Sequence, residues 1–170
     1  MKAAITDANI FIDLIALGLI QHLFGIGYEI HTTREVYDQL NTIQKDELKP
    51  FVLAKKMIVY NFSFEEIVEI GNLILPVGLE AADKTVYYYA IKQQVFVISG
   101  DNKLKSYCES NQLTAKGITW LFDIFLEKEL ISPAYAIDRM EFLLSYNDRL
   151  PKDDCHKRIK KWKPEDSLSS

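Results

Sequence analysis

The sequence predicts an α/β fold in which buried parallel strands alternate with helices. Residues 2–6 and 95–99 are short apolar runs, each followed at once by an amphipathic helical pattern, as in strands of a parallel sheet that lead into helices. The first run is followed by Asp7, and Asp101 stands just beyond the second. In open α/β sheets ligands bind outside the carboxyl ends of the strands. The same pattern therefore predicts a fold and the edge at which a site is expected.

Length and composition fit one compact domain with a sizeable core. The chain has 170 residues, of which 48% are hydrophobic and 12% aromatic, which argues against a disordered protein. The longest apolar stretch, residues 10–20, is broken by Asp13 and is shorter than the roughly 20 residues of a membrane span. Residues 1–7 lack the regions of a signal peptide. We therefore expect a cytoplasmic protein with no membrane segment.

Charge and cysteine content narrow the function classes. The net charge of −4 argues against a surface coated in basic residues for duplex binding. Several clustered carboxylates neutralised by a metal ion would account for much of that charge, so nucleic acid stays among the expected partners. Cys108 and Cys155 are far apart and form no CxxC motif, so neither a disulfide framework nor a zinc site is predicted.

The first third of the chain contains a helix, a strand and a second helical stretch. Residues 9–24 read as one helix, or as two helices broken at Gly18, and residues 28–32 as a second strand. Residues 45–56 look helical, with Pro50 at a boundary between two short helices. This alternation continues the α/β pattern.

Capping residues mark the next helices. Thr33 is expected to cap a helix after the second strand. Residues 57–62 have strand character, and Ser63 with Glu66 forms a capping box for a helix that reaches about residue 73. Residues 79–92 then place an apolar stripe against the sheet. A strand at residues 95–99 follows this helix.

The remainder of the chain reads as helical with a basic end. Helices are expected at residues 102–110, 119–130 and 133–144, the last with Pro133 in its first turn. We assign residues 1–150 to one domain and residues 151–170 to a basic, partly flexible C-terminal tail.

Asp7, Asp83 and Asp101 are the candidate metal ligands. If their two strands are neighbours, Asp7 and Asp101 lie on one rim, and the helix at residues 79–92 directs Asp83 toward it. Carboxylates crowded together repel one another, and a hard, oxygen-seeking Mg²⁺ or Mn²⁺ removes that repulsion. Taken alone, Asp7 fits equally well as the N-cap of the following helix. Asp13 is expected on a solvated helix face, outside the cluster.

Four segments, in this order, resemble the motifs of PIN-domain proteins, the small metal-dependent ribonucleases that include the VapC-type toxins. None of the segments is specific alone, but the ordered set spans residues 1 to about 110. They are Ile5-Thr6-Asp7-Ala8-Asn9, the segment from Thr32 to Leu40, Leu79-Glu80-Ala81-Ala82-Asp83, and Ser99-Gly100-Asp101.

The resemblance implies a PIN-like three-layer α/β/α sandwich with a central, mostly parallel sheet of four or five strands. It implies that Asp7, Asp83 and Asp101 are catalytic and bind Mg²⁺ or Mn²⁺. The chain departs from the family at Gln39, where a glutamate commonly stands. Glu35, one helical turn earlier, is our preferred replacement for that acid. Supporting roles are expected for the polar residues Asn9, Gln39, Glu80 and Ser99.

The implied activity is endoribonuclease cleavage of phosphodiester bonds in single-stranded or structured RNA. A metal-bound water would attack phosphorus, with the carboxylates acting mainly as ligands. Lys103 and Lys105 are the expected RNA-binding residues. The family further suggests the toxin of a toxin-antitoxin pair, bound by an antitoxin protein, and pairing into a homodimer.

Two other function classes compete with the nuclease. Gln39 favours a non-catalytic PIN-like module that binds RNA or protein and has a degenerate metal site. A phospho-acceptor receiver domain also places acids around Mg²⁺, but it requires paired acids after the first strand. Here Asp7 is followed by Ala8, which disfavours that reading.

Overall fold

The computed structural model describes residues 2–165, and in them five strands form one parallel sheet. The strand order is β3-β2-β1-β4-β5, and every neighbouring pair is parallel. The predicted α/β sandwich with a parallel sheet is confirmed, and the sheet has the larger of the two expected strand numbers. The strands are β1 (Lys2–Thr6), β2 (Tyr28–Thr33), β3 (Met57–Tyr60), β4 (Phe96–Ile98) and β5 (Ala115–Lys116).

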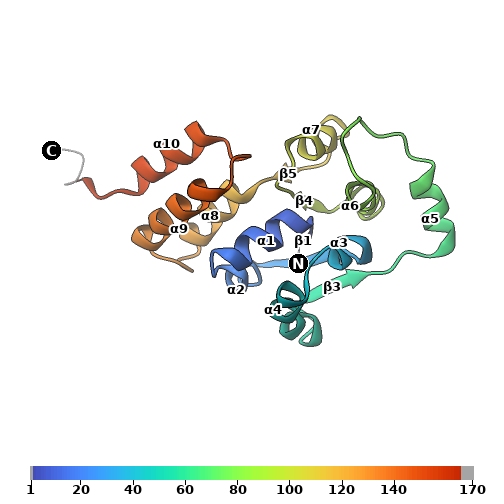
Figure 1. The fold of residues 1–170 in the computed structure, drawn as a ribbon, viewed down its shortest axis with the longest axis horizontal. Coiled ribbons are helices and arrows are strands. Elements are labelled where there is room, and N and C mark those ends of the chain that lie inside the picture. The colour runs from blue at the N-terminus through green and yellow to red at the C-terminus, as the bar shows by residue number, and fades with distance from the viewer. Residues whose placement is uncertain (1, 166–170) are drawn as a thin grey trace.

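Helices cover both faces of this sheet (Figure 1). On one face, α6 contacts β1, β2 and β4 and is flanked by α3, α5 and α7. The other face is covered by α1, α2 and α4, and α8, α9 and α10 extend that layer. The helices are α1 (Ala8–Ala16), α2 (Ile20–Leu23), α3 (Arg34–Asp38), α4 (Thr42–Leu53), α5 (Phe64–Gly71), α6 (Ala81–Gln93), α7 (Asn102–Ser110), α8 (Ile118–Glu127), α9 (Pro133–Tyr146) and α10 (Lys152–Trp162).

The strand order changes direction between β1 and β4. The chain builds β1, β2 and β3 outward on one side and then returns through α6 to place β4 on the other side of β1. Thr6 pairs with Ile98, so the carboxyl ends of β1 and β4 lie side by side. Open α/β sheets bind ligands at this kind of reversal. The condition set for a shared rim, that the strands before Asp7 and Asp101 are neighbours, is therefore met.

The core lies on both faces of the central strands. Ala4 and Ile5 of β1 are fully buried, as are Phe11 on α1 and Phe122 and Phe125 on α8. Each large apolar side chain removed from water stabilises the fold by roughly 1.5–3 kcal/mol. This burial fixes β1 and α1 on either side of Asp7.

The sequence suggested helix breaks at Gly18 and at Pro50, and the structure has a break only at Gly18. Gly18 separates α1 from α2 in a left-handed conformation (φ +68°), which glycine adopts without steric cost. Pro50 was expected to divide two short helices, and that prediction is wrong, because α4 continues through it to Leu53. Pro50 is exposed, so the hydrogen bond that it removes lies on the solvent side of the helix, where water can satisfy the freed carbonyl.

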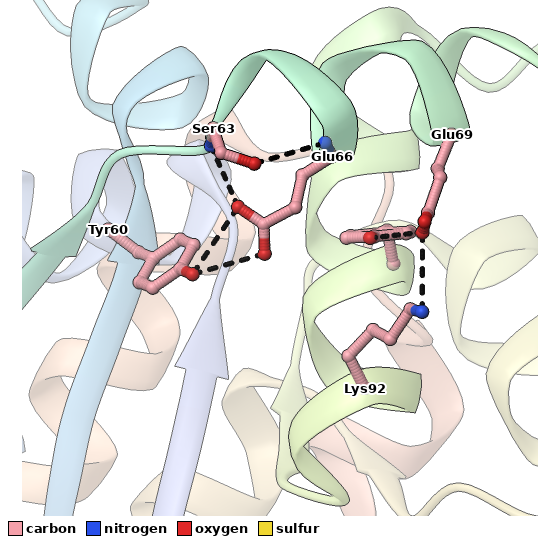
Figure 2. Close-up of polar contacts among 6 residues, drawn as sticks. Tyr60, Ser63, Glu66, Glu69 and Lys92 are labelled. Carbon is pink, nitrogen blue, oxygen red and sulfur yellow. Dashed lines mark hydrogen bonds and ion pairs between the residues drawn. The ribbon is translucent and has the colours of Figure 1, made fainter.

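Helix α5 makes polar contacts with the rest of the domain (Figure 2), and it buries Ile70. The predicted capping box is present: Ser63 N donates to Glu66 Oε2 (2.8 Å), and Glu66 N donates to Ser63 Oγ (3.2 Å). The Tyr60 hydroxyl donates to Glu66 at 3.1 Å, and Glu69 pairs with Lys92 of α6 at 3.2 Å. The outer side of α5 is apolar, with Phe64 77% exposed and Ile67 51% exposed.

The basic C-terminal segment begins with helix α10, which packs on α9. Cys155 and Ile159 are buried, and Trp162 stacks on Phe122 with ring centroids 5.9 Å apart. Arg158 pairs with Asp123 of α8 at 2.8 Å. Residues 166–170 of the predicted tail lie outside the described residues. The division of the chain after residue 150 stays a prediction.

Within residues 2–165, no helix has both the length and the apolar character needed to cross a bilayer.

Candidate functional site

Asp7 joins the end of β1 to the start of α1. Its Oδ1 accepts a hydrogen bond from the Ile10 amide (3.2 Å), so Asp7 is the N-cap of α1. Its Oδ2 accepts from the Ser99 hydroxyl and from the Gly100 amide (3.1 Å), both just beyond β4. The capping role and the predicted role in a cluster are thus compatible, since the two oxygens face different partners.

Asp101 is held in the same loop. Its Oδ1 accepts from the Leu104 amide (2.9 Å), which caps α7, and its own amide donates to Ser99 Oγ (3.0 Å). A Cβ on Gly100 would lie 3.2 Å from the Asn9 Cβ, tighter than usual packing. The absence of a side chain at Gly100 lets the loop approach α1 closely.

Asp83 comes from the first turn of α6. Its Oδ2 accepts from the Glu80 amide (2.8 Å), which fixes the carboxylate at the start of the helix. Burial raises the pKa of Asp83, and the charges of Asp101 and Glu80 raise it further, against the lowering effect of the hydrogen bond from the Glu80 amide. The charge of Asp101 is therefore close enough to Asp83 to affect its ionisation.

The pKa of Asp7 is raised to about 6. Burial is the largest cause, because it removes water from the carboxylate, and the charge of Asp83 adds to the effect. The hydrogen bonds from Ser99, Ile10 and Gly100 oppose the shift without cancelling it. A positive charge near Asp7 would relieve this penalty.

One cleft of about 600 Å³ brings the three acids together at the carboxyl edge of the sheet. Most of the predicted site residues line it. The predicted lining residues are Asp7, Asn9, Gln39, Glu80, Asp83, Asp101 and Lys103; they are joined by Ala8, Val36, Gly78, Ala82, Gly100, Asn102 and Arg149.

Two other predicted residues line a neighbouring pocket. Ser99 and Lys105 face a cavity of about 370 Å³ that shares Asn9, Gly100, Asn102 and Arg149 with the cleft. Ser99 still touches the site through Asp7.

Glu35 is not among the described residues that line the cleft, although the next residue, Val36, is. It sits on α3, which packs against α6, and its Oε2 is buried with no hydrogen-bond partner among the described residues. Gln39, one turn further on α3, lines the cleft itself and is exposed.

Asp13 was expected on a solvated face, and that prediction is wrong. Asp13 is buried, where it accepts hydrogen bonds from Asn147 Nδ2 (3.0 Å) and the Tyr146 hydroxyl (3.4 Å). Both donors come from the end of α9, more than 130 positions away, so local helix periodicity could not reveal them. Burial raises the pKa of Asp13.

The acids are hard oxygen donors, and their mutual repulsion suits a divalent cation. In residues 2–165, however, no group of three or more histidine, cysteine, aspartate or glutamate side chains is arranged to hold a metal ion. Asp7, Asp83 and Asp101 share a cleft without converging on one point.

Sequence reasoning missed Arg149 as a site residue. It follows α9 and lines both the cleft and the neighbouring pocket. Nothing local in the sequence marks it, because the packing of α9 against the rest of the chain brings residues 147–151 to this edge.

Comparisons with known proteins add no assignment: neither a protein family model nor a curated protein sequence matches this chain.

Proposed function

We propose that the protein is a Mg²⁺- or Mn²⁺-dependent endoribonuclease of the PIN-like type. One observation carries the proposal: Asp7, Asp83 and Asp101 come from three separate segments to one cleft at the reversal of strand order. The Asp83 charge raises the pKa of Asp7, and the Asp101 charge raises that of Asp83. Such coupled acids favour a bound cation over the empty cleft.

Each acid has a distinct part in this proposal. Asp7, held by Ser99 and Gly100, would be the fixed ligand, and Asp83 and Asp101 would complete the site from α6 and the β4 loop. A bound divalent cation would lower the pKa of a coordinated water and neutralise charge at the phosphate. Lys103 lines the same cleft, where its ammonium group would attract the RNA backbone.

Glu35 is proposed to supply the carboxylate that the neutral Gln39 does not provide. A buried carboxylate oxygen without a partner costs free energy, and a cation within reach would offset that cost. Gln39 itself offers an amide oxygen at the cleft but no charge.

A non-catalytic RNA- or protein-binding module is the second candidate. It is favoured by the neutral Gln39 in the cleft and by the lack of a convergent metal-binding group among residues 2–165. In this reading the cleft binds a partner without cutting it.

The cellular setting that we propose is cytoplasmic, with RNA as the substrate. An antitoxin protein that covers the cleft and a homodimer formed by the helices after Thr119 are further proposals, which the family resemblance motivates.

The test combines metal binding with RNA cleavage. Calorimetry with Mn²⁺ and a cleavage assay on a mixed single-stranded RNA pool, with EDTA as the metal-free arm, would compare wild type with Asp7→Asn, Asp83→Asn and Asp101→Asn. The exposed Asp46 of α4 supplies the control variant Asp46→Asn, which makes the same charge change away from the cleft.

We expect each cleft variant to lose metal affinity and cleavage activity by at least roughly 10- to 100-fold, the loss caused by changing even a residue that only supports a metal ligand. The Asp46→Asn control should behave as the wild type. Metal binding by the wild type with no cleavage under either metal would select the non-catalytic module. No metal binding at all would overturn the metal-dependent proposal.

A further inference from the structure

The neighbouring pocket of about 370 Å³ lies beside the acidic cleft, and most of its lining residues are not part of the cleft. The β4–α7 loop, the start of α8 and the residues that follow α9 form it. Its volume is in the range that proteins use for small ligands. It shares Asn9, Gly100, Asn102 and Arg149 with the cleft, so a strand lying in one can continue into the other.

One wall of the pocket is an aromatic ring held in place. The Tyr146 ring is 43% exposed, and its hydroxyl donates to the buried Asp13. Phe142 packs against the other part of the ring, with centroids 5.4 Å apart. A partly exposed aromatic ring of fixed orientation is a surface on which a nucleobase can stack.

Two cations line the same pocket. Lys105 and Arg149 both face it, and neither forms an ion pair within the described part of the chain. The Lys105 ammonium lies over Gly117, where a Cβ would come within 2.9 Å of Nζ. The missing side chain at Gly117 gives the ammonium its place in the pocket.

The pocket also contains acids, which argues against a simple anion site. Asp148 is exposed at its rim, and both oxygens of Asp13 accept hydrogen bonds from Tyr146 and Asn147. An aromatic surface, two cations and several polar acceptors and donors, such as Asn102 and Thr119, together match a nucleotide better than a bare phosphate.

We propose that this pocket binds one nucleotide of the RNA strand, next to the phosphodiester bond in the cleft, with its base on Tyr146 and its phosphate between Lys105 and Arg149. The inference rests on the proposed function, because it assigns the flanking part of the same substrate. It makes Tyr146 a binding residue for a single base and Lys105 a contact separate from Lys103.

The test is a length series of fluorescently labelled single-stranded oligoribonucleotides, from two to six nucleotides, measured by fluorescence anisotropy in EDTA and in Ca²⁺. The affinity of the wild type should increase in one step, about 5- to 100-fold, at the nucleotide that reaches the pocket. Tyr146→Ala should abolish the step. Tyr146→Phe loses the same hydroxyl but retains the ring, and it should preserve the step, which separates stacking from a loss of stability.

Lys105→Ala and Gly117→Ala test the phosphate contact in two ways. Lys105→Ala removes the charge and should reduce the salt dependence of binding by about 0.7 in the log–log slope, as expected for one contact to a single strand. Gly117→Ala retains the charge but displaces the ammonium, and it should weaken the same oligonucleotides. Lys49→Ala, an exposed lysine of α4, is the matched control and should change nothing.

A wild-type affinity that increases smoothly with length, or a step that survives Tyr146→Ala, would overturn the proposed pocket. So would the failure of every oligonucleotide to bind. A step without cleavage under Mn²⁺ would support the pocket and remove the nuclease assignment. Cleavage without a step in affinity would contradict the proposed nucleotide pocket but leave the nuclease proposal in place.

Discussion

The surroundings of Asp7 have opposing effects on its ionisation. As the N-cap of α1 and the acceptor for Ser99 and Gly100, it is best ionised, because charged acceptors form the stronger hydrogen bonds. Its burial and the neighbouring Asp83 nevertheless raise its pKa to about 6. Under the proposed function, a cation bound beside Asp7 would remove this conflict, because a positive charge favours the ionised carboxylate.

The raised pKa of Asp7 predicts a pH-dependent stability. The folded protein binds this proton more tightly than the unfolded chain, so the stabilisation is complete below the ordinary pKa of 3.8 and is lost as the pH rises through about 6. Between pH 7 and pH 5, the free energy of unfolding of the wild type should gain about 1 kcal/mol relative to Asp7→Asn. Urea denaturation of both proteins in metal-free buffer measures this difference.

Asp46→Asn is the control for that experiment, since Asp46 is exposed on α4. Its stability difference from the wild type should stay constant over the same pH range. A constant difference for Asp7→Asn as well would show that Asp7 titrates at its ordinary value, and the argument for a strained carboxylate would fail.

At the residue scale, the sequence predicted those site residues that directly follow strands or begin a helix. Asp7 and Asp101 could be placed because parallel strands end at a common edge, and Asp83 because it lies in the first turn of the helix that precedes β4. Arg149 and the burial of Asp13 could not be predicted. Both depend on where the end of α9 packs, and no periodicity in the sequence encodes a contact between residues more than 130 positions apart.

At the scale of elements, α5 combines polar contacts to β3 and α6 with an exposed apolar side. Glu66 accepts a hydrogen bond from the Tyr60 hydroxyl (Figure 2), and Glu69 accepts one from the Tyr88 hydroxyl. Phe64 of the same helix is exposed. A globular protein usually has the opposite arrangement, with the apolar stripe facing the core. The capping box therefore contributes a larger share of the local stability of α5 than of a helix held by apolar packing.

Ser63→Ala should loosen α5 selectively. The substitution removes the acceptor for the Glu66 amide and costs about 1 kcal/mol, which corresponds to a roughly fivefold faster amide exchange in residues 64–71. Hydrogen exchange followed by mass spectrometry measures this change. Ser63→Thr preserves a capping hydroxyl and should retain the protection. Unchanged exchange in Ser63→Ala would show that the tyrosine contacts hold α5 by themselves.

Elements with strong local signals were predicted well, and those without them were not. Ser63 and Glu66 specify the start of α5, and Asn102–Ser110 forms α7 as expected, because a cap and a helical period act within one segment. Strand β5, only two residues long, owes its existence to pairing with β4 and has no pattern of its own. The helix boundary predicted at Pro50 was wrong, because the effect of a proline depends on which side of α4 faces water.

At the scale of the whole molecule, the C-terminal helices complete both the core and the site. Helix α10 covers α9 through the buried Cys155 and Ile159, and Trp162 reaches Phe122 on α8. The residues between α9 and α10 supply Arg149 to the cleft. Stability and site geometry are therefore linked through the packing of α8, α9 and α10.

A chain that ends at Leu150 should be less stable than one that ends at Lys163. The shorter chain lacks α10, so it exposes the apolar surface that Ile159 and Trp162 cover, at a cost of at least about 2 kcal/mol in the free energy of unfolding. Thermal and urea denaturation of both chains, with the full-length protein as reference, measure this cost. The chain ending at Lys163 retains α10 and should match the reference. Equal stability of all three would instead show that residues 1–150 fold on their own and that α10 is a removable tail, as the composition of the sequence first indicated.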